Sequence, residues 1–410
     1  MSDELAVHGG TPVRTTPFAS WPVFDEAEEQ ALLRVLRSRR WGRHGEGEIE
    51  RVEQRFAARH GARFGLVVAN GTVALRIALL AMEIEAGDEV IVPPYTFLAT
   101  ATAVVEANAT PIFVDIEDET FNLDPRLIEA AITPRTRAII PVHMAGLPAN
   151  MEAITAIARR HQLRVIEDAA HAHGGLCQGR PVGSWGDLAC FSFQSSKNLN
   201  SGEGGAVLTS DERLYERAKS VHNCGRLPEG AWYEHHIISG NYRLTEFQAA
   251  LLNTQMDRLD AQFARRLENG DYLARRLADV PGIRPQRCTL PQTQNAYHLL
   301  LFHFDPAVYG PKAGFLTALR AEGVPVSEGY LLPLHQQPLF RDKAFGPYTG
   351  YRSARPDVDF AAMSCPVAER ACTADAAWLY QSVLLGTQQD LDDIVTAFEK
   401  VHRHRARLPR

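Results

Sequence analysis

The stretch GLVVANGTVALRIALLAM, residues 65–82, contains the strand–turn–helix pattern on which the fold is built. Residues 65–68 form a short apolar run that is typical of a buried β-strand. Residues 73–82 have the length and apolar spacing of a helix, and the turn before them holds Asn70, Gly71 and Thr72. We therefore predict a strand that is followed directly by a helix.

The same alternation of apolar runs and amphipathic stretches continues to residue 209. A helix is predicted at residues 151–160, and further strands are predicted at residues 89–92, 111–114, 138–142, 164–166, 188–193 and 206–209. Strands that alternate with helices indicate an α/β fold with a mostly parallel sheet that is covered on both faces. Ligands of such sheets bind beyond the carboxyl ends of the strands.

A second region begins near Met256 with a long charged helix, followed by irregular strands and by helices at residues 312–322 and 387–401. We interpret it as a smaller C-terminal α/β domain. The predicted division is a large domain at residues 1–255, which starts with an N-terminal arm of about 20 residues, and a small domain at residues 256–410.

Composition excludes several classes of protein. The chain has 410 residues and a formal net charge of -6, which gives no general reason to expect nucleic-acid binding. Its six cysteines are scattered without a C-x-x-C pair, so we expect neither a structural zinc site nor a dense disulfide framework. We see no signal sequence and no apolar stretch that could span a membrane, and the expected location is the cytoplasm. The basic residues at 402–407 are interpreted as a solvated end.

Lys197 is the first candidate for chemistry. It lies in a loop of small and polar residues between two predicted apolar strands, and Gly202, Gly204 and Gly205 follow it. A lysine that forms a Schiff base must be held out of bulk water, so that its amine loses its proton easily. The segment fits that need, but an exposed loop lysine would produce the same local pattern.

Asp168 follows a predicted buried strand, in the run Glu167-Asp168-Ala169-Ala170-His171. A carboxylate there can pair with the protonated nitrogen of a pyridine ring, and His171 can donate a hydrogen bond to an oxygen on the same ring. Two alternatives remain open at this point. Asp168 can cap a following helix, or Asp168, His171 and His173 can bind a metal ion.

Polar and aromatic residues follow three further strands. Gly71 and Thr72 precede a predicted helix whose first amides favour an anion, and the hydroxyl of Ser192 can join them. Tyr95 and Phe97 follow another strand, where one of them can stack on a planar ring. His143 follows a third strand and can reach the same crevice. Ordinary helix capping and ordinary aromatic packing are the competing interpretations.

Together these motifs resemble the DegT/DnrJ/EryC1/StrS family of fold-type-I aminotransferases, which use pyridoxal 5'-phosphate (PLP). The resemblance runs from Phe18 to the C-terminal helix. The most specific pieces are NGT at 70–72, PYTF at 94–97, EDAAHAHG at 167–174, the segment 192–205, and GNYRLTEFQAA at 240–250. It implies a large domain with a seven-stranded, mostly parallel sheet and a small C-terminal domain.

The resemblance also implies roles for individual residues. Lys197 would form the Schiff base with PLP, Asp168 would pair with the pyridine nitrogen, and Phe97 would stack on the ring. His171 would lie near the ring oxygen, although many relatives carry glutamine at that position. The phosphate would be bound by Gly71, Thr72, Ser192 and, across the interface of a homodimer, by Asn241 of the second subunit.

The expected reaction moves an amino group from L-glutamine or L-glutamate to a ketone. The segments VHMAG at 142–146 and FQSSK at 193–197 are more similar to aminotransferases of inososes and to 3-amino-5-hydroxybenzoate synthases than to nucleotide-sugar aminotransferases. A cyclitol or free-sugar ketone is therefore the predicted acceptor. The alternatives are a nucleotide sugar, a dehydrating and aromatising lyase, and a non-catalytic regulatory protein that binds PLP. Candidate substrate residues are Tyr95, His143, Arg226, Tyr330 and His335.

Overall fold

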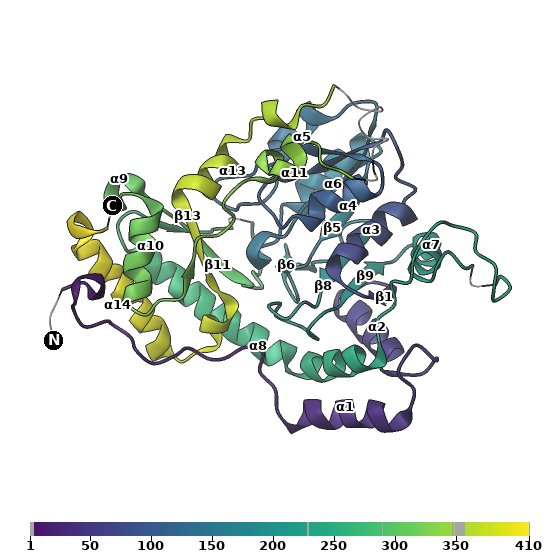
Figure 1. The fold of residues 1–410 in the computed structure, drawn as a ribbon, viewed down its shortest axis with the longest axis horizontal. Coiled ribbons are helices and arrows are strands. Elements are labelled where there is room, and N and C mark those ends of the chain that lie inside the picture. The colour runs from purple at the N-terminus through teal and green to yellow at the C-terminus, as the bar shows by residue number, and fades with distance from the viewer. Residues whose placement is uncertain (1–3, 228, 289, 347, 349–356, 410) are drawn as a thin grey trace.

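The computed structural model describes residues 4–227, 229–288, 290–346, 348 and 357–409. A large domain and a small domain are connected by the 33-residue helix α8 (Glu246–Ala278), which runs along both (Figure 1). Both described ends of the chain lie beside the small domain.

The large domain is built on a seven-stranded sheet in the order β1-β9-β8-β5-β4-β2-β3. Only β9 runs antiparallel to its two neighbours, so the predicted mostly parallel sheet is confirmed. The strands are β1 (Phe64–Val68), β2 (Glu89–Val92), β3 (Thr110–Phe113), β4 (Thr136–Ile139), β5 (Arg164–Asp168), β8 (Leu188–Ser192) and β9 (Gly205–Thr209). A short hairpin, β6 (Leu176–Cys177) and β7 (Arg180–Pro181), lies between β5 and β8 in the chain.

Successive side chains of a buried strand point to opposite sides of the sheet, so both faces of this sheet are apolar. Helices cover both faces. In β1, Leu66 and Val68 belong to one apolar cluster and Val67 belongs to another. The helices of the large domain are α1 (Glu26–Ser38), α2 (Glu48–Arg59), α3 (Gly71–Ala81), α4 (Ala99–Glu106), α5 (Pro125–Ala131), α6 (Met151–Arg160) and α7 (Glu212–His222). Among these, α6 has the bounds that its apolar spacing predicts.

The small domain packs helices against a four-stranded sheet in the order β10-β11-β13-β12. Its apolar cluster joins the strands to α10 and α14. The strands are β10 (Ile283–Pro285), β11 (Leu299–Phe304), β12 (Val326–Ser327) and β13 (Ala376–Tyr380), and the helices are α9 (Pro306–Tyr309), α10 (Lys312–Ala321) and α14 (Gln388–Arg403). Two short helices, α11 (Pro338–Arg341) and α13 (Pro366–Arg370), instead lie against the apolar cluster of the large domain.

Helix α8 begins ten residues before the start that we predict from the sequence, so the predicted division at residues 255 and 256 falls inside it. Leu259 belongs to a large-domain cluster, whereas Leu273 belongs to the small-domain cluster. The N-terminal arm also differs from expectation, because Leu5 is buried in the small-domain cluster. The arm therefore starts on the small domain before it reaches α1.

All six cysteines are free thiols. None of the described helices is both long enough and apolar enough to cross a lipid bilayer.

Candidate active site

A cavity of about 810 Å³ opens at the carboxyl ends of the parallel strands. Its lining comes from the start of α3, the segment before α4, the end of β5, the end of β8 and the loop after it. Every predicted cofactor residue except Asn241 lines it, namely Gly71, Thr72, Phe97, Asp168, His171, Ser192 and Lys197. Residues that are far apart in the sequence therefore meet in one crevice.

Lys197 projects from a compact loop between β8 and β9. The amide of Lys197 donates to the Gln194 carbonyl at 2.8 Å, and the amide of Ser195 donates to the Gly202 carbonyl at 2.9 Å. The side chain of Asn198 donates to the Ala296 carbonyl at 2.7 Å and so joins the loop to the chain that leads into β11. These bonds fix the backbone on both sides of the lysine.

Burial lowers the pKa of Lys197 to about 8, although the Asp168 carboxylate acts in the opposite direction. The neutral amine is the nucleophile, so about a tenth of the protein is reactive at pH 7 and about nine tenths at pH 9.

We expect the rate at which the cofactor-free protein captures PLP to rise with pH up to about 8 and then to level off. Stopped-flow absorption with free lysine as the reference amine measures this profile. A rate that continues to rise tenfold per pH unit up to pH 10 would mean that the environment of Lys197 does not depress its pKa.

Asp168 is the last residue of β5 and is 5% exposed. Its Oδ2 accepts a hydrogen bond from the Thr100 hydroxyl at 2.8 Å, and its Oδ1 accepts one from the Ala170 amide at 3.3 Å. Burial raises the pKa of this carboxyl, and a cation placed against it would lower the pKa again. Asp168 does not cap a helix, because a turn follows it.

His171 is a hydrogen-bond donor toward the cavity. Its Nδ1 accepts the Ala145 amide at 3.3 Å, and burial holds its pKa well below the usual range, so the neutral ring carries its proton on Nε2. The ring of His298 packs on that of His171 with centroids 4.4 Å apart. His298 and Thr100 are residues that the sequence did not single out.

The start of α3 has backbone amides that are free to bind an anion. The amides of Gly71 and Thr72 have no acceptor within the helix, as in the first turn of any helix, and the Asn70 side chain takes the amide of Val73 at 2.9 Å. A Cβ added to Gly71 would lie 2.7 Å from the Cβ of Ser192. The helix thus approaches the end of β8 as closely as glycine allows.

Gly71→Ala is expected to weaken PLP binding by about tenfold or more, roughly 1.4 kcal/mol, because the new methyl group separates the two halves of the anion site. Equilibrium titration of the cofactor-free protein with PLP measures the effect. Gly42→Ala is the matched control, since a Cβ there meets nothing within 4 Å. If the Gly71 variant bound PLP as tightly as the parent, the close approach would have no role in binding.

The two predicted aromatic residues behave differently. Phe97 lines the cavity and is 61% exposed, so its ring is free to cover a planar ligand. Tyr95 is fully buried and packs against Tyr330, with ring centroids 5.2 Å apart. Its hydroxyl is buried without a partner among the described residues. Tyr330 in turn packs edge-on against Trp378 of β13. Neither Tyr95 nor Tyr330 lines the cavity, which differs from the prediction.

His143 does not reach the crevice. It is fully buried, its Nε2 lies 3.1 Å from Oε2 of Glu167, and its Nδ1 accepts the Ala149 amide at 3.1 Å. Burial alone would raise the pKa of Glu167, but His143 and the amides of Gly183 and Gly186 more than offset this and lower it. The structure therefore corrects our expectation, because this pair stabilises the sheet beneath the site.

Three other predicted residues also lie away from the cavity. His335 is fully buried, with its Nε2 3.1 Å from a carboxylate oxygen of Glu369. Arg226 lies in the loop after α7, where its guanidinium covers the ring of Trp232 at 5.4 Å. Asn241 is exposed at the base of the same loop, where it pairs with Asn223 just after α7. Within one chain, neither Arg226 nor Asn241 lines the cavity.

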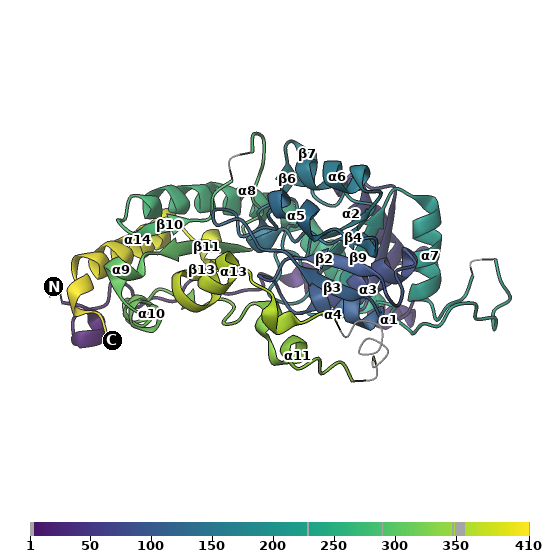
Figure 2. The same cartoon turned by 90° about the horizontal axis from the view of Figure 1, so that it is seen from above.

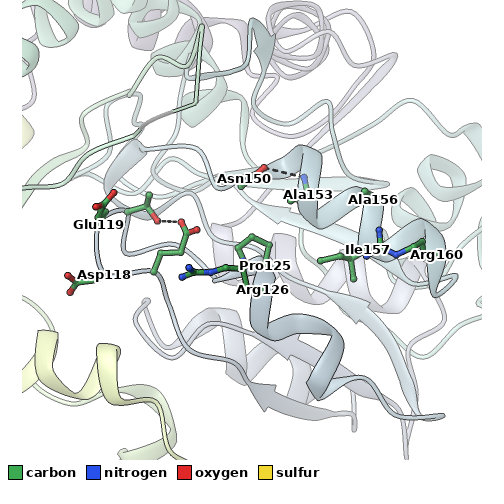
Figure 3. Close-up of a pocket in the computed structure, with 11 residues that line it drawn as sticks. Asp118, Glu119, Pro125, Arg126, Asn150, Ala153, Ala156, Ile157 and Arg160 are labelled. Carbon is green, nitrogen blue, oxygen red and sulfur yellow. Dashed lines mark hydrogen bonds between the residues drawn. The ribbon is translucent and has the colours of Figure 1, made fainter.

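A second cavity, of about 750 Å³, lies between α5, α6 and the loop at residues 117–120 (Figure 3). Its two arginines are paired with neighbours, Arg126 with Asp124 and Arg160 with Glu129. It contains no predicted site residue. In the described part of the chain no group of three His, Cys, Asp or Glu residues is placed to hold a metal ion.

The first cavity fits PLP by the chemistry of its residues. It offers an amine with a depressed pKa, a buried carboxylate, and a helix start that only glycine lets approach Ser192. Each of these matches one group of the cofactor, respectively the aldehyde, the ring nitrogen and the phosphate.

Comparison with known proteins supports the same assignment. Residues 22–384 match the DegT/DnrJ/EryC1/StrS aminotransferase family. Two similar proteins of Streptoalloteichus tenebrarius are an L-glutamine:2-deoxy-scyllo-inosose aminotransferase, 39% identical with all of both chains covered, and a protein provisionally named L-glutamine:3-amino-2,3-dideoxy-scyllo-inosose aminotransferase. The latter is 42% identical, with 98% of this chain and 99% of the relative covered.

Among solved structures, that of 3-amino-5-hydroxybenzoic acid synthase superposes with a TM-score of 0.86. It is 36% identical, with 95% of this chain and 100% of that chain covered. The fold, the arrangement of the cavity and the match over most of the chain agree. The protein belongs to the DegT/DnrJ/EryC1/StrS family and is a PLP-dependent aminotransferase of fold type I.

Proposed function

We propose that this aminotransferase carries PLP on Lys197 and moves the amino group of L-glutamine to the ketone of an inosose, a cyclitol ring. The observation that carries the proposal is the meeting of Lys197, Asp168 and the anion site of α3 in one cavity. The choice of donor and acceptor is supported by the relatives of 39% and 42% identity, whose names specify L-glutamine and an inosose.

Different residues of the cavity would bind different groups of the cofactor. The amides of Gly71 and Thr72 and the hydroxyl of Ser192 would bind the phosphate at the positive end of α3. Asp168, held by Thr100, would keep a proton on the ring nitrogen. Nε2 of His171 would donate to the ring oxygen, and Phe97 would cover the ring face.

PLP, when bound, supplies an electron sink that makes the proton on the substrate carbon acidic. Lys197 contributes both covalent attachment and proton transfer. Its Nζ would hold the cofactor covalently, and the freed amine, kept neutral by burial, would take the proton from the donor α-carbon. The same amine would return a proton to the carbon of the acceptor.

A competition assay tests the acceptor. The bound cofactor is first converted to its amine form with L-glutamine. The rate of a single turnover is then measured with 2-deoxy-scyllo-inosose and with a nucleotide-linked keto sugar. We expect faster turnover with the inosose. Preference for the nucleotide sugar would overturn the proposed acceptor while leaving the family assignment intact.

The similarity to 3-amino-5-hydroxybenzoic acid synthase favours a second candidate, in which the same lysine removes protons during dehydration and aromatisation. That reaction consumes no amino donor. Release of water and an aromatic product from an aminated ring acid, without L-glutamine, would favour this candidate over amination.

We further propose that the working unit is a homodimer. The loop after α7 projects far from the body of the chain (Figure 2), and it exposes Trp232 to 76%, Tyr233 to 76% and Ile238 to 98%. Apolar side chains this exposed are typical of an interface. The second copy would cover the loop, and Asn241 at the base of the loop would then reach the phosphate in that copy.

Mixing two inactive variants tests the shared site. Lys197→Ala and Asn241→Asp each damage every site of their own dimers, the second because its carboxylate repels the phosphate. In a mixed dimer one site has both intact residues, so we expect recovery of about a quarter of the parent activity after random exchange of subunits. A mixture that stays inactive although subunit exchange is demonstrated would contradict the shared site.

A further inference from the structure

Arg266 of α8 is a buried cation without a matching anion. The side chain is fully buried, and among the described residues no neighbouring charge offsets the effect of burial on its pKa. Its Nε donates to the Gln381 side chain at 2.9 Å and its Nη2 to that of Gln262 at 3.4 Å, whereas Nη1 is buried without a partner. Burial lowers its pKa to about 9. A buried charge of this kind is costly unless other groups stabilise it.

The indole of Trp21 supplies the missing electron-rich partner. The Cζ of Arg266 lies 4.9 Å from the centre of the Trp21 ring, a cation–π contact. The same indole donates from Nε1 to the carbonyl of Ser195 at 2.8 Å. Ser195 stands two residues before Lys197, so Trp21 connects a buried cation to the loop that carries the reactive amine.

Trp21 belongs to the N-terminal arm, which is itself fastened to the small domain. Glu322 accepts the amides of Ala6 at 2.8 Å and Val13 at 3.0 Å, and Arg14 forms ion pairs with Asp390 and Asp393 of α14. From there the arm runs beneath the molecule to α1 (Figure 1). Trp21 therefore lies on an arm that is fixed to the small domain, and it is hydrogen-bonded to the lysine loop.

A fixed loop backbone has a direct use in this chemistry. Lys197 must leave and rejoin the cofactor in every cycle, and the freed amine must stay close to the reacting carbon to move a proton. On its other side the loop is held by Asn198, through Ala296 and His298. The bond from Trp21 to Ser195 holds the loop before Lys197, and the bond from Asn198 holds it after Lys197.

Resting on the proposed role of Lys197, we propose that Trp21, backed by Arg266, is a positioning residue for the reaction: the N-terminal arm fixes the Lys197 loop through the bond from Nε1 of Trp21 to the Ser195 carbonyl. Loss of this bond loosens the loop and slows the proton transfers of Lys197. It leaves the recognition of the amino donor unchanged.

Two substitutions separate the two contacts. Trp21→Phe keeps an aromatic face over Arg266 but removes the N–H group, and Trp21→Leu removes both. Trp41→Phe is the matched control, because the Trp41 indole donates to a carbonyl on α1 outside the site. Hydrogen–deuterium exchange of residues 193–204 in the cofactor-free protein measures the loop directly, since the amides of Ser195, Lys197 and Ser201 are hydrogen-bonded within it. Steady-state kinetics of the loaded enzyme give kcat and the KM for L-glutamine.

For Trp21→Phe we expect faster exchange in residues 193–204 and a kcat about threefold to tenfold lower, with the KM for L-glutamine unchanged. Trp21→Leu should show larger changes in the same direction, and Trp41→Phe none. Unchanged exchange in both Trp21 variants would overturn the proposal, as would faster exchange with an unchanged kcat. If the parent protein transaminated nothing, the proposed function would fail, while the exchange data would still decide whether the arm holds the loop.

Discussion

Lys197→Ala is expected to fold and to bind PLP without a covalent bond, and to lose turnover by roughly 10⁴-fold or more. The substitution removes the nucleophile and the proton carrier together, and alanine offers neither function. Folding should be unaffected, because the Lys197 side chain forms no hydrogen bond or ion pair with a described residue, and the backbone bonds of Lys197 and its neighbours remain. Circular dichroism, PLP titration and a coupled transamination assay measure the three properties.

Lys219→Ala, on α7 and away from the cavity, is the matched control and should retain full activity. Transamination by the Lys197 variant within tenfold of the parent rate would contradict the assignment of this residue. Loss of folding in the variant would instead show that Lys197 has a structural role.

Asp168→Asn is expected to lower kcat by about 10²- to 10³-fold while the cofactor still binds. Asparagine has the same shape and can still accept the Thr100 hydroxyl, but it carries no charge to keep a proton on the ring nitrogen. The ring then withdraws electrons less strongly, so the donor α-carbon loses its proton more slowly. Single-turnover kinetics with L-glutamine isolate this step.

Thr100→Val separates orientation from charge, because it removes only the hydroxyl that Asp168 accepts at 2.8 Å. We expect a loss of about tenfold or less for this variant. An Asp168→Asn enzyme that is as fast as Thr100→Val would indicate that the negative charge of Asp168 contributes nothing to the reaction.

Local patterns predicted the part of the fold that depends on neighbouring residues. The apolar runs placed the strands of the large sheet, and the Asn70 cap placed the start of α3 within two residues. The start of α8 was missed, although Thr245 and Gln248 form a capping box that marks it.

Contacts between distant segments were beyond prediction. The bond of Thr100 to Asp168 spans 68 residues, and the bond of Trp21 to Ser195 spans 174. His143 was expected at the site because it follows a strand, but its ring turns inward to the Glu167 carboxylate. The apolar pattern of a sequence predicts where a strand ends. The direction of the side chains after that end depends on contacts with distant segments, which form only in the folded chain.

The absorption spectrum of the protein with PLP, before and after L-glutamine, tests most directly whether Lys197 carries PLP and whether L-glutamine is the donor. We expect a visible band from the lysine-bound cofactor that disappears when L-glutamine is added, and no such band in Lys197→Ala. A band that persists in the presence of L-glutamine would contradict the proposed donor, and a parent protein without any band would contradict the role of Lys197.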